Sequence, residues 1–144
     1  EEYSVKFNIL GPFAFGGKGL PRNVHYSLGN FIEDVRRGRD IIINGNGKDV
    51  RSYMHQDDFV RVILEIAKDS RNFTLHNVGS EEKITLKELA NKIIEIDGLK
   101  RNVFIKSLKS ENHNFYVPSF KKFKKEFNFD IKFQLSDIVQ DMLN

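Results

Sequence analysis

Residues 45–53 read Gly-Asn-Gly-Lys-Asp-Val-Arg-Ser-Tyr, and they connect an apolar run, Ile41–Ile43, to a segment of helical period that begins at Asp57 or Asp58. Two glycines separated by one residue permit a tight reversal of the backbone. Arg51 follows this turn and offers a planar fork of N–H donors, which suits a phosphate. The stretch therefore predicts a strand, a turn that directs Arg51 at an anion, and a helix. An ion pair between Arg51 and a carboxylate such as Asp58 is the alternative.

The composition limits the kind of protein to which that arginine belongs. A chain of 144 residues, 40% of them hydrophobic and 12% aromatic, can bury one core, so residues 1–144 form one domain at most. The 23 basic and 20 acidic side chains give a net charge of +3, which does not require a nucleic-acid partner. Cysteine is absent, which excludes disulfides and thiolate metal sites and suits a reducing compartment.

Targeting and metal signals are also missing from the sequence. No apolar run approaches the roughly 18 residues of a membrane span, and the acidic Glu1-Glu2 start differs from a signal peptide. We therefore expect a soluble cytoplasmic protein with no membrane partner. The histidines lack the spacing of metal ligands, so no metal site is expected. They are His25, His55, His76 and His113.

Periodicity predicts a mixed α/β chain with about five helices and four short strands. The expected strands cover residues 4–10, 40–44, 73–78 and 102–106, and a glycine-rich loop is expected over 13–23. The expected helices cover residues 26–37, a segment from Asp57 or Asp58 onward, the segment from Thr85 to Gly98, a short segment after Ser119, and the C-terminal end.

Helix ends and apolar faces support these assignments. Thr85 and Glu88 have the spacing of a capping box, and Gly38 and Gly98 are natural helix stops. Ser119 and one of the two adjacent aspartates are expected to cap their helices. The residues expected on inner faces are Phe59, Val62, Ile63 and Ile66; Leu86, Leu89, Ala90, Ile93 and Ile94; Phe120, Phe123 and Phe127; and Leu135, Ile138, Val139, Met142 and Leu143.

The strands have a consequence for the extent of the fold. Four apolar strands spread along the chain need neighbours in a larger sheet than these residues build alone. The sequence also starts within a few residues of a strand, with no preceding helix to cover it. We therefore expect the chain to be one portion of a larger fold.

Six motifs occur in an order and spacing that resemble a known family. They are Phe7–Pro12, Ile43–Gly47, Val50–Tyr53, Asp57-Asp58, His76–Ser80 and Leu86–Ala90. The chain resembles the C-terminal, substrate-binding part of NAD-dependent nucleotide-sugar epimerases and dehydratases, which are extended short-chain dehydrogenases. Residues 28–32 are similar to a helix of the dTDP-glucose 4,6-dehydratase and UDP-glucuronate decarboxylase branch, and residues 116–118 and 127–129 are similar to the family's tail.

The resemblance implies roles for three residues. Asn8 occupies the place of an asparagine that contacts the substrate, and Asn30 that of an asparagine beside the nucleotide diphosphate. Arg51 occupies the place of the arginine that binds this diphosphate. The implied partner is a UDP- or dTDP-linked sugar, in an NAD-dependent enzyme of surface-polysaccharide synthesis that forms a homodimer.

This chain also departs from the family's pattern. Val5, with Lys6 beside it, stands where the family usually has arginine, and Asn44 replaces an aromatic or apolar residue that helps to hold the base. Ser52 replaces the commoner aspartate, a change shared with the surface-polysaccharide relatives. The sequence therefore leaves open the base, the sugar and the choice among epimerase, dehydratase and decarboxylase.

No catalytic residue is expected in this chain. The family's chemistry needs a Gly-x-x-Gly-x-x-Gly turn for NAD and a tyrosine followed four residues later by lysine. The residues four positions after the tyrosines are Phe7, Asn30, Asp57 and Phe120. No glycines have the dinucleotide spacing either. NAD is therefore expected to bind an N-terminal region that this sequence does not contain, and the chain alone is expected to be inactive.

Two other sequence features have simpler explanations than a site. Residues 11–18 half resemble a phosphate-binding loop, but Lys18 comes one position late and Gly19 stands where a serine or threonine should bind magnesium. The four lysines within residues 121–125 alternate with phenylalanines at helical spacing, which favours a solvated helix face over a nucleic-acid patch.

Two functions remain open at this point. The chain is either the substrate-binding lobe of an NAD-dependent nucleotide-sugar enzyme or a stand-alone, non-catalytic module that binds nucleotide sugars or regulates another protein. Both predict binding of a nucleotide diphosphate, and only the first predicts turnover in the parent protein.

Overall fold

The computed structural model describes residues 5–21, 26–69, 73–107 and 113–144. The mixed α/β prediction is confirmed, with five helices in the described ranges. The helices are α1 (Ser27–Arg36), α2 (Gln56–Lys68), α3 (Leu86–Asp97), α4 (Lys121–Phe127) and α5 (Leu135–Leu143). The strands are β1 (Asn8–Pro12), β2 (Phe15–Gly16), β3 (Ile41–Ile43), β4 (Val50–Arg51), β5 (Met54–His55), β6 (Thr74–Val78), β7 (Ile84–Thr85), β8 (Val103–Ile105) and β9 (Phe115–Tyr116).

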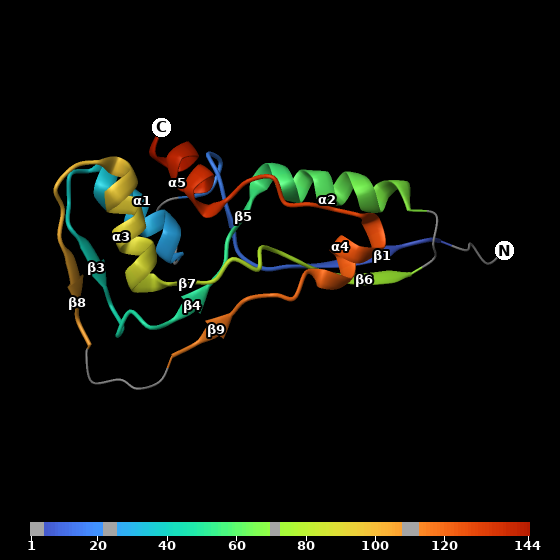
Figure 1. The fold of residues 1–144 in the computed structure, drawn as a ribbon, viewed down its shortest axis with the longest axis horizontal. Helices are drawn as coiled ribbons and strands as arrows, with labels where there is room; N and C mark the ends of the chain where they lie inside the picture. The colour runs from blue at the N-terminus through green and yellow to red at the C-terminus, as the bar shows by residue number, and fades with distance from the viewer. Residues whose placement is uncertain (1–4, 22–25, 70–72, 108–112) are drawn as a thin grey trace.

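The strands form small sheets in which parallel pairing predominates. β1 pairs with β6, β2 with β5 and β3 with β8, all parallel. β4 lies between β7, which is antiparallel to it, and β9, which is parallel. Parallel partners need long crossovers, so each pair joins segments that are far apart in the sequence. Figure 1 shows the result, an elongated body with α1, α3 and α5 at one end and α2 and α4 at the other.

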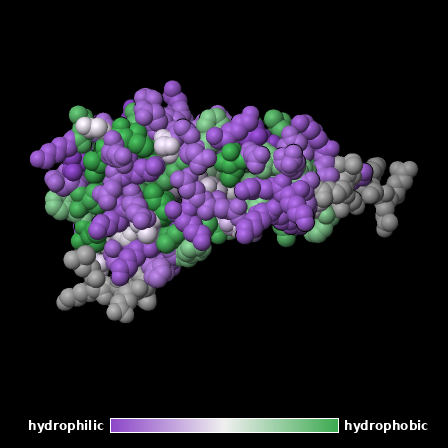
Figure 2. Space-filling model, viewed as in Figure 1, coloured by the Kyte–Doolittle hydropathy of each residue, from purple (hydrophilic) through white to green (hydrophobic). Residues whose placement is uncertain are grey.

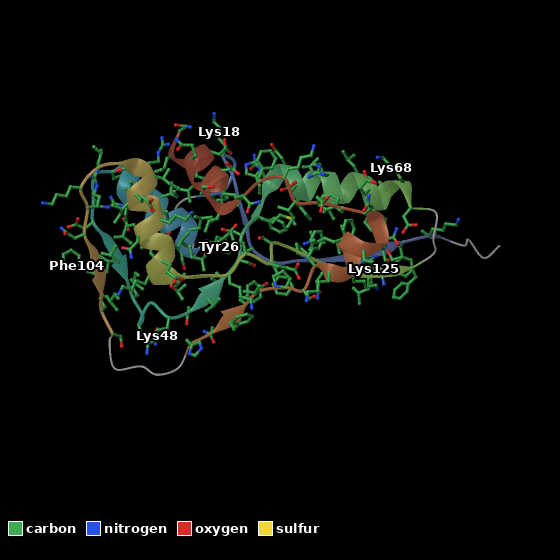
Figure 3. All side chains as sticks on the ribbon, in the orientation of Figure 1. Lys18, Tyr26, Lys48, Lys68, Phe104 and Lys125 are labelled. Carbon is green, nitrogen blue, oxygen red and sulfur yellow. The ribbon has the colours of Figure 1, made fainter. Side chains whose placement is uncertain are left out.

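Each end of the molecule has its own hydrophobic cluster. The first packs α1, α3 and α5 against β3, and fully buried Leu28, Leu89 and Ile138 come from its three helices. The second joins α2 and α4 to β6 through Val62, Phe123 and Val78. Both follow from amphipathic helices that bury one stripe each. The lysines of α4 lie on its solvent side, as Lys125 illustrates in Figure 3, while Phe123 is buried. The surface over α2 and α4 is mainly polar in Figure 2.

The third expected helix matches the sequence prediction at both ends. The Thr85 side chain accepts from the Glu88 backbone N–H, and the Glu88 carboxylate accepts from the Thr85 N–H at 2.9 Å. Gly98 closes α3 in the left-handed conformation, at φ 73°. A glycine takes that conformation without the penalty that a Cβ imposes.

Three expectations about helix ends and faces were wrong. α2 begins at Gln56 and is capped by His55, whose Nδ1 accepts from the Asp57 N–H, so neither aspartate is the cap. The residue at the N-cap position of α4 is Phe120, whose ring is buried, and Ser119 is not the capping residue. Ile63 is 42% exposed because the inward stripe of α2 runs through Asp58 and Val62 instead.

The strand expectations were right in place but incomplete in number. Four of the observed strands, β1, β3, β6 and β8, overlap the four expected ones, although β1 continues to Pro12, past the expected end at residue 10, and β2 lies within the expected loop. The short strands β2, β4, β5, β7 and β9 were not expected, and each is only two residues long, too short for a periodic signal. Residues 22–23 of the expected loop and Ser4 lie outside the described residues.

Removal of the α3 capping hydroxyl offers a local test. Backbone and side-chain hydrogen bonds from Thr85 hold the pKa of Glu88 below its ordinary value of 4.5. A lowered carboxyl pKa contributes stability above the unfolded pKa, and that contribution is lost as the pH falls through the folded pKa. Thr85→Ala is expected to raise the Glu88 pKa, measured by NMR titration, and to cost about 1 kcal/mol of stability at neutral pH. Thr85→Ser should keep both the low pKa and the stability, and an alanine variant as stable as the wild type would contradict the capping role.

Sheet β1–β6 has one covered and one open face. Side chains alternate along a strand, and His76 and Val78 of β6 turn inward to the cluster beneath α2 and α4. On the other face Ile9 pairs with Leu75, and these side chains are 43% and 53% exposed. Parallel sheets are almost always covered on both faces. The open apolar face is therefore unusual for a parallel pair.

Candidate functional site

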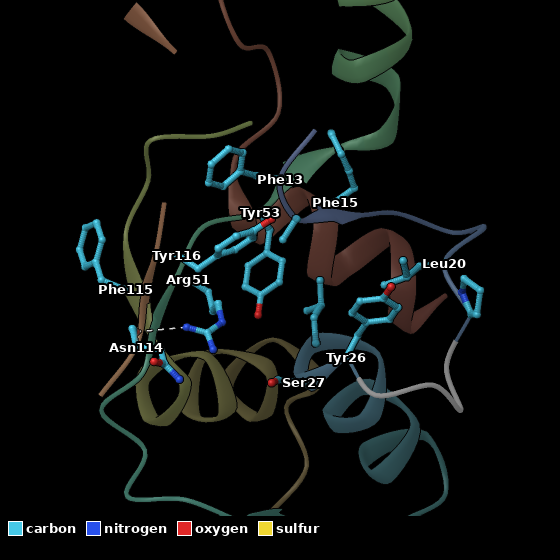
Figure 4. Close-up of a pocket in the computed structure, with 13 residues that line it drawn as sticks. Phe13, Phe15, Leu20, Tyr26, Ser27, Arg51, Tyr53, Asn114, Phe115 and Tyr116 are labelled. Atoms are coloured by element: carbon cyan, nitrogen blue, oxygen red, sulfur yellow. Dashed lines mark hydrogen bonds between the residues drawn. The ribbon is translucent and has the colours of Figure 1, made fainter. Parts of the chain in front are cut away.

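The cavity around Arg51 is the candidate site. It has a volume of about 880 Å³ and is lined from four parts of the chain: the loop after β1, the start of α1, the β4–β5 segment and β9. Polar and charged groups come from Arg51, Tyr53, Asn114, Ser27, Tyr26 and Tyr116. Figure 4 shows the Arg51 guanidinium inside this space, below the Tyr53 ring and beside Asn114. A large concave site with a few convergent polar groups is typical of small-molecule binding.

The neighbouring backbone holds the Arg51 guanidinium in place. Its Nη1 donates to the Val50 carbonyl at 2.9 Å and to the Asn114 carbonyl at 3.2 Å. Its Nη2 donates to the Asp49 carboxylate at 3.2 Å. The other Asp49 oxygen accepts from the Asn114 N–H at 2.8 Å, which ties β4 to β9 beneath the arginine. The alternative of an ion pair with a carboxylate is therefore also met, but with Asp49 as the partner, since Asp58 pairs with Arg61.

These contacts leave part of the guanidinium available. Three of the five N–H donors of an arginine are used, and Nε donates to no described residue. The Arg51 side chain is 22% exposed, so the group is neither buried nor loosely solvated. A guanidinium fixed on one side and open on the other is preorganised for an anion, because little side-chain entropy remains to be lost on binding.

Aromatic rings form the walls beside the arginine. Phe13 stacks on Tyr116 with ring centroids 4.6 Å apart and planes at 30°. Tyr26, which also lines the cavity, is 61% exposed. Exposed rings in a concave site provide flat surfaces on which a nucleobase or a sugar can stack. The site therefore combines one fixed cation with several aromatic surfaces.

The structure does not gather the three expected binding residues in one place. Arg51 lines the cavity, whereas Asn8 and Asn30 do not. The Asn8 side-chain oxygen accepts from the Thr74 hydroxyl at 2.6 Å and from the Thr74 N–H at 3.1 Å, which fixes β1 beside β6. Asn30 is exposed on α1, one turn beyond Ser27. Substrate contacts by these two asparagines stay predictions.

The glycine-rich loop is not a phosphate cradle. The Lys18 N–H donates to Asp141 at 2.9 Å and the Gly19 N–H donates to Gln56 at 3.3 Å. Gly16 lies so close to α5 that a Cβ there would fall 2.3 Å from the Ile138 Cγ2. Backbone amides that bind protein side chains cannot also hold a dinucleotide diphosphate. The described residues therefore do not fit NAD at this loop.

Several cavity residues were missed by the sequence reasoning. Tyr53 is two residues beyond Arg51, so an extended segment places both side chains on one side, and that spacing could have identified it. Asn114, Phe115 and Tyr116 reach the site because β9 pairs with β4 across more than sixty intervening residues. A pairing at such distance leaves no signal in local periodicity.

The sequence profile of the NAD-dependent epimerase/dehydratase family matches residues 1–79, which include β1, the glycine-rich loop, Arg51 and α2. This chain belongs to that family. The family prediction made from the six motifs is confirmed, and the matched part contains the arginine and most of the cavity.

Curated relatives agree with the family assignment. The chain is 31% identical over 91 residues to dTDP-glucose 4,6-dehydratase from Streptomyces griseus, a match that covers 63% of this chain and 25% of that enzyme. It is 29% identical over 93 residues to UDP-N-acetyl-alpha-D-glucosaminuronate decarboxylase from Bacillus cytotoxicus, covering 62% of this chain and 26% of the relative. The matches thus span about a quarter of these enzymes.

Solved structures share the fold over nearly the whole chain. UDP-glucose 4-epimerase from Thermotoga maritima, solved with UDP-glucose, superposes with a TM-score of 0.86 at 23% identity, covering 99% of this chain and 46% of the epimerase. UDP-glucuronic acid 4-epimerase from Bacillus cereus, solved with UDP-glucuronic acid and NAD, gives 0.79 at 16% identity, covering 94% and 43%. This chain spans less than half the length of either. In its described part, no helix has the length and apolar character to cross a membrane.

Proposed function

We propose that this chain binds the nucleotide diphosphate of a nucleotide-sugar substrate, with Arg51 as the principal anion ligand. The observation that carries the proposal is a guanidinium fixed by Asp49 and two carbonyls and open on one side to a cavity of about 880 Å³. A cavity in this size range can enclose most of a ligand as large as a nucleotide.

The chemistry of the cavity fits both halves of such a ligand. The diphosphate supplies oxygens for the free guanidinium edge, and each charge-assisted hydrogen bond is worth roughly 1.5–3 kcal/mol. The exposed ring of Tyr26 supplies a stacking surface for the base or the sugar. The relatives and solved neighbours act on or contain UDP- and dTDP-linked sugars by their names, which supports this class of ligand.

Catalysis is assigned to a region outside this chain. The glycine-rich loop does not fit a dinucleotide, and the sequence has no tyrosine followed four residues later by lysine. NAD supplies hydride transfer in this family, and we place its site and the Tyr/Lys pair in an N-terminal part of a longer enzyme. Residues 1–144 then form the substrate-binding lobe, inactive alone, which positions the sugar through contacts remote from the reacting bonds.

The open face of sheet β1–β6 supports a larger protein. Exposed Ile9 and Leu75 belong to a parallel pair, and Phe7 meets Phe73 beside them with ring centroids 5.4 Å apart. Covering this face would bury apolar surface that otherwise meets water. We assign the cover to the dinucleotide-binding region of a cytoplasmic homodimeric enzyme of polysaccharide synthesis. The alternative is a stand-alone nucleotide-sugar module, and turnover by the intact protein with NAD decides between them.

Arg51→Ala tests the proposal directly. The variant is expected to bind UDP or dTDP at least tenfold more weakly than the intact wild-type protein, because one or more charge-assisted hydrogen bonds are lost. Isothermal titration calorimetry measures the change. The matched control is Arg39→Ala, which removes an exposed arginine paired with Asp34 away from the cavity and should leave affinity unchanged. Equal affinity in wild type and Arg51→Ala would overturn the proposal.

A further inference from the structure

Tyr53 shares the cavity with Arg51 because of the backbone between them. Arg51 ends β4 and Met54 begins β5, and residues 52–53 continue between the two short strands. Side chains two positions apart on an extended segment emerge on the same side, and both Arg51 and Tyr53 line the cavity. Ser52, which lies between them, is buried and does not line it. Figure 4 shows the Tyr53 hydroxyl and the guanidinium pointing into the same space.

The Tyr53 ring is packed while its hydroxyl has no protein partner among the described residues. The residue is 7% exposed and belongs to the cluster of α1, α3 and α5, which holds the ring in one orientation. The hydroxyl oxygen is not fully enclosed by protein, and the residue lines the cavity. The hydroxyl therefore reaches open space there. Buried tyrosines usually place the O–H against a partner. A hydroxyl held here by a rigid ring is available to a ligand.

The protonation state makes this hydroxyl a donor. Burial raises the pKa of Tyr53 to about 12, and the nearby positive charge of Arg51 opposes that rise. The phenol is therefore protonated throughout the physiological range and carries an O–H beside a guanidinium. An oxygen atom with a negative charge can accept from both groups at once, whereas a cation or an apolar group can use neither. The pair is thus suited to an anion.

We propose that Tyr53 is a second anion ligand of this chain and that its hydroxyl donates to a phosphate oxygen of the diphosphate held by Arg51. The inference rests on the proposed function, which it deepens by adding a neutral donor to the charged one. A neutral donor adds affinity without further desolvation of a charge, and its rigid ring fixes where the phosphate lies. Tyr53 thereby distinguishes ligands with a phosphate from those without one.

Tyr53→Phe isolates the hydroxyl, since it keeps the ring and its packing. In the intact protein, we expect UDP affinity to fall about tenfold, the loss of one hydrogen bond to a charged group. Uridine affinity, measured by ligand-observed NMR, should stay the same because uridine carries no phosphate. Thermal unfolding of the variant provides the check that the ring still packs.

The outcomes separate this inference from the proposed function. Loss of UDP affinity with uridine affinity unchanged supports Tyr53 as a phosphate ligand. Unchanged UDP affinity in Tyr53→Phe, alongside weakened binding in Arg51→Ala, overturns this inference and leaves the proposed function intact. Equal losses for UDP and uridine assign Tyr53 a packing role and also overturn it. Unchanged UDP affinity in Arg51→Ala overturns the proposed function itself.

Discussion

Asp58→Ala is expected to lower the free energy of unfolding by about 3–5 kcal/mol, because it deletes one partner of a buried charged network. The Asp58 side chain is fully buried. Its carboxylate accepts from the Lys132 N–H at 3.1 Å and the Phe133 N–H at 3.0 Å, and it pairs with Arg61 at 2.5 Å. Alanine would leave two backbone donors and a partly buried guanidinium without their acceptor. The desolvation penalty of each of these groups would then no longer be compensated by a hydrogen bond.

The network explains why the effect should spread beyond α2. Arg61 also donates to the Asp130 carbonyl at 3.0 Å, and its guanidinium lies 4.6 Å from the centre of the Phe129 ring. Asp58 and Arg61 therefore fasten the segment before α5 onto α2. We expect Asp58→Ala to loosen α5 as well, which hydrogen exchange of the α5 amides would detect as faster exchange.

Urea denaturation of matched variants measures the stability change. Asp57→Ala is the control, since Asp57 is the neighbouring residue and its side chain is 61% exposed. Its loss removes only a favourable interaction with the helix dipole and should cost less than about 1 kcal/mol. Asp58→Asn keeps the shape and one acceptor oxygen and should fall between the two. A cost below 1 kcal/mol for Asp58→Ala would contradict the role of the buried carboxylate.

The contrast between Asp58 and Thr85 marks what the sequence could predict. The capping box of α3 needs only residues three positions apart, so its signal is local, and the sequence located it correctly. The backbone donors to Asp58 lie 74 and 75 positions away, and no local pattern distinguishes it from Asp57. The same limit applies to the cap of α2, where a histidine took a position that small polar residues usually fill.

The candidate site divides in the same way. Arg51 was identified because a glycine turn and an arginine stand together in nine residues, and the family resemblance gave it a ligand. The walls of the cavity come from α1, β9 and the loop after β1, which only the tertiary fold brings beside it. Asn8 shows the converse, because its side chain is engaged by Thr74 across a parallel strand pair that the sequence did not reveal.

Phe123→Ala is expected to destabilise the protein by about 3–5 kcal/mol, the range for truncation of a buried aromatic residue. Phe123 is 1% exposed at the centre of the second cluster. Its ring stacks on Phe120 at 5.0 Å and on Phe127 at 4.4 Å, and meets Phe129 edge-on at 5.4 Å. Paired rings of this kind add stability beyond the area that they bury, so a cavity here loses both packing and ring contacts.

A short helix depends on that packing more than a long one does. α4 has seven residues, fewer than an isolated helix needs in water, so its formation relies on the buried rings. We therefore expect Phe123→Ala to melt α4 and release Phe127 together with the cover of β6. Phe104→Ala removes a ring that is 53% exposed on β8 and should change the urea midpoint little. If the two variants lose similar stability, the aromatic cluster does not hold α4 to the sheet.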